Sequence, residues 1–180
     1  MRHFVRLKFC FFFTVAVLIL FAGGSTAASL ELMSNDFKNN GEVPLKYTGF
    51  GEDISPELCW ADVPDGTQSF VIILDDPDAP VGNWVHWVIY NIPSASRILK
   101  RGIAKNGTLS DGTCQGVNSF GQIGYNGPYP PQGPAHRYIF TLYALDVLPN
   151  MKEAADKAKV LKNITPHILA QAKLMGWCKQ

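Results

Sequence analysis

The sequence has 180 residues, of which 47% are hydrophobic and 17% charged, and its formal charge is +1. This length corresponds to about one domain, which is large enough to bury a hydrophobic core without stabilising cross-links. No run of basic residues occurs, so neither nucleic acid nor an anionic membrane surface is expected as a partner.

The N-terminus is predicted to be a secretory signal peptide. A short basic segment precedes an apolar run over residues 9–22, and small residues follow it. The alternative is a membrane anchor, but the run is shorter than the ~20 residues that a membrane-spanning helix needs. We place cleavage after Ala27 or Ala28. Residues 1–28 are then removed, and residues 29–180 form a single exported domain, periplasmic or secreted, with no stable membrane anchor.

The chain after cleavage differs from the full sequence in charge and in cysteine content. It would carry 13 basic and 15 acidic residues, a formal charge of −2. It would retain Cys59, Cys114 and Cys178, whose spacing fits no metal-binding motif, so no metal is expected. An exported protein can form disulfides, and the sequence leaves open whether two of these cysteines are joined.

Short apolar runs separated by turn residues dominate the chain. Residues 30–60 are more polar, with residues 46–48 expected as an edge strand. Three longer runs follow, over residues 69–74, 87–92 and 137–145, and each ends at Asp or Pro. Each run has the length of a strand and is apolar on both faces, which is typical of the middle of a sheet packed on both sides.

Helices are expected only late in the chain. Residues 151–162 carry Ala and Lys at helical spacing. A second helix is expected to begin with Thr165 as its N-cap and Pro166 in its first turn, and to end near Gly176. The predicted architecture is a mostly-β sandwich with a few peripheral helices, including a C-terminal helical segment.

An Asp-Pro-rich segment follows the first long strand. Asp and Pro are ordinary turn residues, so the simplest interpretation is a turn. However, Pro77 and Pro80 make the segment rigid and suited to supporting a side chain. Asp76 and Asp78 lie two positions apart, so one carboxylate is able to face a pocket while the other anchors the loop.

Two further polar groups begin the next long strands. His86 lies between tryptophans and, taken alone, is better explained as a packed residue. His136 and Tyr138 are expected on one face of their strand, and Arg137 on the other. Arg137 is therefore free to pair with a carboxylate of the Asp-Pro segment.

A long loop over residues 106–133 is rich in Gly, Asn and Pro, and loops of this length are usually functional. Its backbone N–H groups are suited to contacting a ligand oxygen. Together with two histidines, a tyrosine and two carboxylates, this set suits a phosphate or a carboxylate. It lacks the closely spaced ligand pair of a zinc site.

At these positions the sequence resembles the phosphatidylethanolamine-binding protein family, also called Raf kinase inhibitor protein-like, and its bacterial and archaeal YbhB/YbcL branch. Six motifs occur in family order, at residues 55–60, 76–80, 84–93, 116–121, 127–131 and 136–138. The resemblance implies a Greek-key antiparallel β-sandwich with a pocket for phosphate, acetate, cacodylate or a phospholipid head group.

The resemblance also implies which residues form the pocket. The ligand-binding set is Asp76, Asp78, His86, Gly127 through its backbone, Pro130, His136 and Tyr138, supported by Pro77, Pro80 and Arg137. The Ala79–Pro80 bond is expected to be cis. Tyr129 stands where this branch commonly has Cys, and its larger side chain is expected to narrow the pocket or to add a donor.

Three functions remain open, and no cofactor is expected for any of them. The first is binding of a small anionic ligand. The second is inhibition or modulation of a protease, a kinase or a host protein, which would make that protein a partner. The third is a hydrolase with His86 or His136 as general base, which is disfavoured because no activated nucleophile accompanies them. No catalytic residue is therefore assigned.

Overall fold

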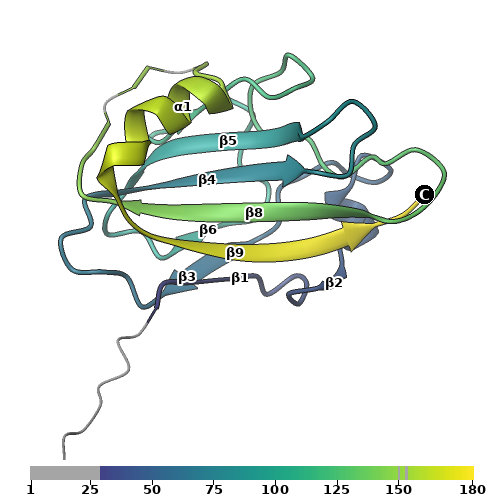
Figure 1. The fold of residues 1–180 in the computed structure, drawn as a ribbon, viewed down its shortest axis with the longest axis horizontal. Helices are drawn as coiled ribbons and strands as arrows, with labels where there is room; N and C mark the ends of the chain where they lie inside the picture. The colour runs from purple at the N-terminus through teal and green to yellow at the C-terminus, as the bar shows by residue number, and fades with distance from the viewer. Residues whose placement is uncertain (1–28, 150, 153) are drawn as a thin grey trace, which may run out of the picture.

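The computed structural model describes residues 29–149, 151–152 and 154–180, so the predicted signal peptide lies outside the described residues. Two sheets pack face to face (Figure 1). The smaller sheet has the order β1-β3-β6, with bounds Glu31–Met33, Leu58–Ala61 and Ile98–Leu99. The larger has the order β2-β9-β8-β4-β5-β7, with bounds Gly41–Glu42, Ile168–Cys178, His136–Leu145, Ser69–Asp76, Trp84–Pro93 and Cys114–Gln115.

The three long apolar runs form the central strands β4, β5 and β8, as predicted. In β4, Phe70, Ile72 and Leu74 face the core between the two sheets. The intervening Val71 and Ile73 face a second core on the outer side of the larger sheet. All five are fully buried, which explains why the run has no polar face.

The strand order confirms the predicted antiparallel Greek-key sandwich. The hairpin partners β4 and β5 pair antiparallel, and β8 then pairs with the other edge of β4 after a connection through β6 and β7. One pair departs from the antiparallel pattern, because β2 runs parallel to β9.

The prediction of an edge strand at residues 46–48 is wrong. A short 3-10 helix, η1 (Leu45–Tyr47), occupies this position. Pro44, with a φ of −59°, begins it, and its carbonyl accepts the N–H of Tyr47 at 2.9 Å. The hydroxyl of Thr48 donates to the carbonyl of Leu45 at 2.7 Å, a local bond that competes with pairing in a sheet.

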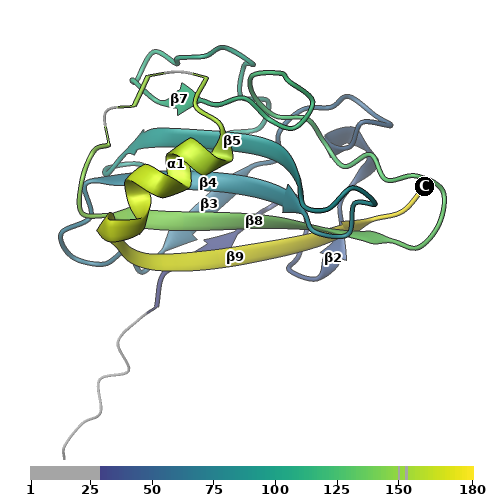
Figure 2. The same ribbon diagram turned by 45° about the horizontal axis from the view of Figure 1, so that its top comes forward.

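The first predicted helix is present but starts later, as α1 (Lys157–Ile164), with Asp156 as its N-cap. Figure 2 shows it lying across the outer face of the larger sheet. Its buried residues, Val160 and Ile164, contribute to the outer core beside Val71 and Ile73. This face of the sheet is therefore covered by the late helical segment.

The prediction of a second helix between Thr165 and Gly176 is wrong. A single 3-10 turn, η2 (Thr165–His167), leads directly into β9, which pairs with β8 along its length. The segment contains good helix formers, but Ala172, Leu174 and Gly176 alternate with more exposed residues. Pairing and burial against β8 therefore override helical propensity. The helical segment precedes the last strand and does not end the chain.

The described cysteines, Cys59, Cys114 and Cys178, are free thiols. Among the helices of the described residues, none combines the length and the apolar character needed to cross a membrane. The same part of the chain contains no group of three or more side chains placed to hold a metal ion.

A substitution at Gly176 tests whether this residue packs closely within β9, as described. Its added Cβ would lie 2.5 Å from Cγ2 of Val43 and 3.0 Å from Cε2 of Phe37. We expect Gly176→Ala to lower the free energy of unfolding by about 1–3 kcal/mol, the usual cost of overpacking, in urea titrations. Lys173→Ala, exposed on the same strand, should stay within about 0.5 kcal/mol of the wild type. Equal stability of the two variants would contradict the packing described.

Candidate functional site

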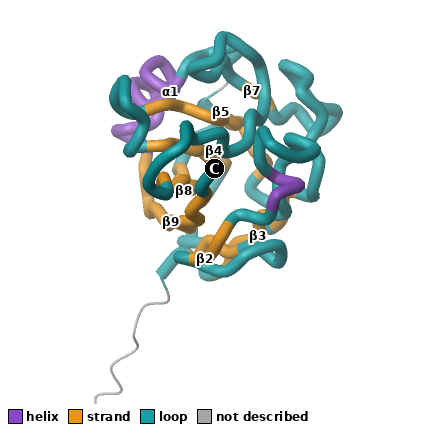
Figure 3. Tube along the Cα trace, turned by 90° about the vertical axis from the view of Figure 1, so that its right-hand side faces the viewer, coloured by secondary structure: helices purple, strands orange, loops and turns teal. Residues whose placement is uncertain are grey.

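A cavity of about 250 Å³ lies where β4 ends and β5 and β8 begin. Figure 3 looks at this end of the sandwich, where long loops gather around the strand ends. The polar lining groups are Asp76, His86 and His136. Aromatic rings and prolines form most of the wall, namely Trp84, Phe120, Tyr129, Pro80, Pro130 and Pro131. Four of the predicted ligand-binding residues thus line one cavity, namely Asp76, His86, Pro130 and His136, together with the predicted supporting residue Pro80.

His136 is oriented by Asp76. Its Nδ1 lies 2.8 Å from Oδ2 of Asp76, and both side chains are almost completely buried. A carboxylate accepts the hydrogen from Nδ1, which leaves Nε2 as the ring nitrogen for the cavity. The other carboxylate oxygen, Oδ1, accepts the backbone N–H of Asp78 at 2.9 Å. Asp76 therefore uses both oxygens inside the protein.

His86 is oriented in the same way by a backbone carbonyl. Its Nδ1 lies 2.8 Å from the carbonyl oxygen of Asn126, which accepts a hydrogen and cannot donate one. Nδ1 therefore carries the proton, and Nε2 is left for the cavity. Burial lowers the pKa of His86 below its ordinary value of 6.5, and the Asn126 carbonyl and the Asp76 carboxylate oppose that shift.

Tyr138 packs against His86 and does not line the cavity. The two rings meet edge to face with their centroids 5.2 Å apart. Burial, reinforced by the Asp76 carboxylate, raises the pKa of the Tyr138 hydroxyl well above its ordinary value. The hydroxyl is buried and makes no hydrogen bond of standard geometry among the described residues, although the Asp76 carboxylate and the Tyr129 backbone lie close enough to influence it. Tyr138 thus supports His86 and holds a spare donor beside the site.

Asp78 anchors the turn and does not line the cavity. Its Oδ2 accepts Nε of Arg137 at 2.9 Å, and its Oδ1 accepts Nη2 at 2.7 Å. The backbone N–H of Arg137 adds a third bond at 2.9 Å. These bonds lower the pKa of Asp78 to about 2. Of the two carboxylates left open by the sequence, Asp78 is thus the partner of Arg137.

The expectation of a cis Ala79–Pro80 bond is wrong, because the described residues contain no cis peptide bond. The backbone N–H of Gly82 donates to the carbonyl of Ala79 at 3.0 Å and closes a four-residue turn. Pro80 is the second residue of this turn, where a trans proline is favoured, whereas cis-proline turns place the proline third.

Gly127 borders a second cavity of about 230 Å³ next to the first, and Phe120 and Tyr129 line both. Any side chain at position 127 would collide with the carbonyl oxygen of Tyr47, since an added Cβ would lie 2.3 Å from it. The backbone N–H of Gly127 donates to Oδ1 of Asp53 at 2.6 Å. This amide is therefore used inside the protein, unlike the expected contact with a ligand.

Tyr129, the residue that departs from the pattern of this branch, lines the first cavity and lies at its rim. Its ring packs on Phe50 with a centroid distance of 4.5 Å and is still 59% exposed. Phe120 is also partly exposed, and its ring meets Trp84 and His86 edge to face. The mouth of the first cavity is therefore aromatic.

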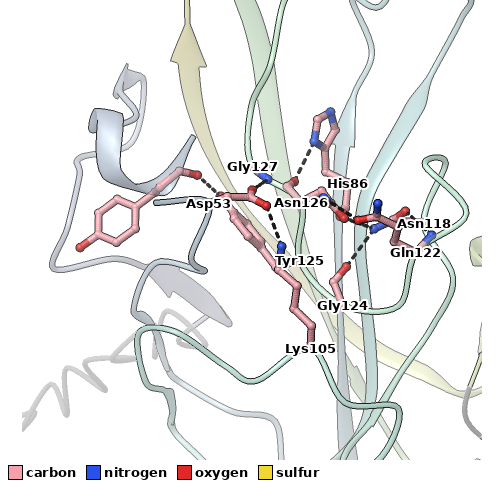
Figure 4. A network of polar contacts seen from close by, with 10 residues as sticks. Asp53, His86, Lys105, Asn118, Gln122, Gly124, Tyr125, Asn126 and Gly127 are labelled. Carbon is pink, nitrogen blue, oxygen red and sulfur yellow. Dashed lines mark hydrogen bonds and ion pairs between the residues drawn. The ribbon is translucent and has the colours of Figure 1, made fainter. Parts of the chain in front are cut away.

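Sequence reasoning missed the residues that hold the loop against His86. Asn118 is buried, and its Nδ2 donates to Oδ1 of Asn126 at 2.7 Å and to the carbonyl of Gly124 at 3.0 Å (Figure 4). Its Oδ1 accepts the backbone N–H groups of Phe120 and Gln122. The many Asn and Gly residues of this loop indicated that side-chain hydrogen bonds hold it, but no local pattern identifies which Asn holds the loop against His86.

The Asp78–Arg137 pair makes a contribution to stability that depends on pH. Because the pKa of Asp78 is lower in the folded protein, its ionised carboxylate stabilises the fold. This stabilisation is fully present above the unfolded-state pKa of 3.8 and is lost as the pH falls toward the folded-state pKa of about 2. Both side chains are partly exposed, so we expect Arg137→Gln to cost about 1 kcal/mol at pH 6. Urea titrations should show the difference shrinking by pH 3. A difference that stays constant from pH 6 to pH 3 would contradict this assignment.

The comparisons with known proteins agree with this fold and these motifs. The sequence model of the phosphatidylethanolamine-binding protein family matches residues 33–179. A UPF0098 protein from Aquifex aeolicus is 46% identical over 163 residues, covering 89% of this chain and 94% of its own length. YbhB from Escherichia coli is 42% identical over 153 residues, covering 81% and 97%. The crystal structure of E. coli YbcL matches with a TM-score of 0.79 and 31% identity, over 85% of this chain and 99% of that one. The chain therefore belongs to the phosphatidylethanolamine-binding protein family, in the branch that includes YbhB and YbcL.

Proposed function

We propose that this protein is an exported binding protein whose cavity takes a small anion, such as a phosphate, a carboxylate or a phospholipid head group. The observation that carries the proposal is the pair of imidazoles, His86 and His136. Each ring has its Nδ1 engaged inside the protein at 2.8 Å, which leaves each Nε2 for the cavity. Two such nitrogens in one small cavity are suited to adjacent oxygens of a single ligand.

Protonation decides what these nitrogens bind. A neutral ring with its hydrogen on Nδ1 offers Nε2 as an acceptor, whereas the protonated ring donates from both nitrogens. An anion oxygen needs a donor, so binding requires a proton on the ring or on the ligand itself. Because burial disfavours the charged form of His86, the anion must supply the compensating charge.

Binding is better supported than hydrolysis by the rest of the lining. The first cavity contains no Ser, Thr or Cys among its described lining residues, so a hydroxyl or thiol nucleophile of that kind is missing there. Both oxygens of Asp76 are occupied by hydrogen bonds to His136 and Asp78. The polar groups therefore suit holding a ligand more than attacking it.

The affinity for anions should rise as pH falls. We expect sulfate, which does not itself titrate near neutral pH, to bind more tightly at pH 5.5 than at pH 7.5, because His86 must gain a proton. Inorganic phosphate should follow the same trend. His86→Gln should weaken sulfate binding at pH 5.5 by roughly tenfold to a hundredfold, the range for a charge-assisted hydrogen bond. Isothermal titration calorimetry measures both effects.

The matched control is His167→Gln, which removes an exposed histidine paired with Asp146. It should leave sulfate affinity and its pH dependence unchanged. An affinity of the wild type that is equal at pH 5.5 and pH 7.5 would contradict the role of His86.

Export is the second part of the proposal, and it rests on the basic and apolar order of residues 1–28. We expect the protein recovered from the exported fraction to begin at Ala28 or Ser29, as read by N-terminal sequencing. Ile19→Asp interrupts the apolar run and should leave the full-length chain inside the cell. Recovery of exported wild type that still begins at Met1 would contradict cleavage.

A further inference from the structure

We propose that Asp53 is a positioning residue for this site, which fixes the Asn126–Gly127 peptide and through it the proton on Nδ1 of His86. The inference deepens the proposed function and rests on it. Asp53 does not line the first cavity, and its carboxylate makes no direct contact with the His86 ring. Its effect therefore has to pass through the backbone between them.

The connection is a short series of hydrogen bonds (Figure 4). Oδ1 of Asp53 accepts the backbone N–H of Gly127 at 2.6 Å. That N–H belongs to the same peptide unit as the carbonyl of Asn126, because the peptide bond is planar. The Asn126 carbonyl in turn accepts Nδ1–H of His86 at 2.8 Å. Asp53 and His86 thus hold the two opposite ends of one peptide unit.

Asp53 is itself held in place. Its φ of 54° is left-handed, a conformation that Asp adopts more readily than most residues. Its second oxygen, Oδ2, pairs with Nζ of Lys105 at 2.6 Å. On the far side of the peptide, Asn118 holds the Asn126 side chain at 2.7 Å. The peptide unit is therefore held from both sides, and Asp53 provides the charged contact.

The consequence for the site is the choice of tautomer. With the Asn126 carbonyl in place, the neutral ring keeps its hydrogen on Nδ1 and presents Nε2 as an acceptor. If the peptide rotates, Nδ1 loses its acceptor, and the ring is free to carry the hydrogen on Nε2. A neutral ring of that form donates to an anion without gaining a proton. Loss of Asp53 should therefore weaken the dependence of anion binding on pH.

The other groups that face His86 would remain in such a variant. They are Asp75 and Asp76 of β4, His136 and Tyr138 of β8, and Phe120. The Gly127 backbone also influences His86, and it belongs to the segment that Asp53 holds. The charge of Asp53 is not among the main electrostatic influences on His86. A change in the titration of His86 on loss of Asp53 would thus report a change in geometry.

The test compares Asp53→Ala with Lys105→Met. The first removes the acceptor for Gly127, and the second removes the ion pair but leaves the carboxylate. Long-range 1H–15N NMR spectra distinguish the two neutral tautomers of His86, and calorimetry with sulfate gives the affinity between pH 5.5 and pH 7.5. Both measurements use the processed full domain.

In the wild type and in Lys105→Met, we expect neutral His86 to carry its hydrogen on Nδ1. In Asp53→Ala, we expect a mixture of tautomers. Sulfate affinity at pH 5.5 should fall about threefold to tenfold, as for loss of one hydrogen bond. Its change between pH 5.5 and pH 7.5 should be smaller than in the wild type. A general loss of stability would lower affinity at all pH values and leave the tautomer unchanged.

Two results would overturn the inference. One is a folded Asp53→Ala variant whose neutral His86 keeps its hydrogen on Nδ1, whether or not its sulfate affinity changes. The other is a wild type whose neutral His86 carries its hydrogen on Nε2, a measurement that needs no variant and decides the matter even if Asp53→Ala does not fold. Failure of the wild type to bind sulfate or phosphate at all would instead overturn the proposed function, and the NMR result would still report on Asp53.

Discussion

The antiparallel pairing of β4 with both β5 and β8 is the constraint on which the rest of the structure depends. Asp76 is paired with Trp84 at one edge of β4, and Asp75 is paired with Ile139 at the other. This register places the last residues of β4 beside the first residues of its two neighbours. A shift by one residue would turn each side chain to the opposite face of the sheet. Because the two sets of apolar side chains of β4 pack into different cores, such a shift would exchange them, and the close packing of both cores opposes it. The same packing therefore keeps the site assembled.

The polar groups of the site follow from the cost of burying them. A buried imidazole or carboxylate without a partner is strongly unfavourable, so each one is paired within the protein. Asp76 satisfies His136, and the Asn126 carbonyl satisfies His86. Because these partners occupy Nδ1 in both rings, the nitrogens left for the cavity are both Nε2. The donors and acceptors that the two rings offer to the cavity are thus decided by the groups bonded to Nδ1, namely the Asp76 carboxylate and the Asn126 carbonyl.

The long loop over residues 106–133 provides the site with free backbone hydrogen-bonding groups, which the strands do not have. A strand uses its backbone groups in the sheet, whereas this loop directs one carbonyl to His86 and one N–H to Asp53. Gly127 is required there because the chain passes too close to Tyr47 for any side chain. Asn118 replaces missing backbone pairing with side-chain hydrogen bonds. The loop therefore has a defined conformation although it lacks regular secondary structure over most of its length.

The sequence by itself determined the central strands, the sandwich class and the family, because apolar runs, turn residues and ordered motifs are local. It also named Asp76, His86, Pro130 and His136, which line the cavity. It also indicated that Arg137 pairs with a carboxylate of the Asp-Pro segment. Only the tertiary structure decided that this carboxylate is Asp78, that β9 is a strand, and that the Ala79–Pro80 bond is trans. It alone joined Asp53 to Gly127 and Asn126 to His86. The physical reason is that these contacts join residues far apart in the chain, and their geometry is set by strand register and burial, which local patterns do not encode.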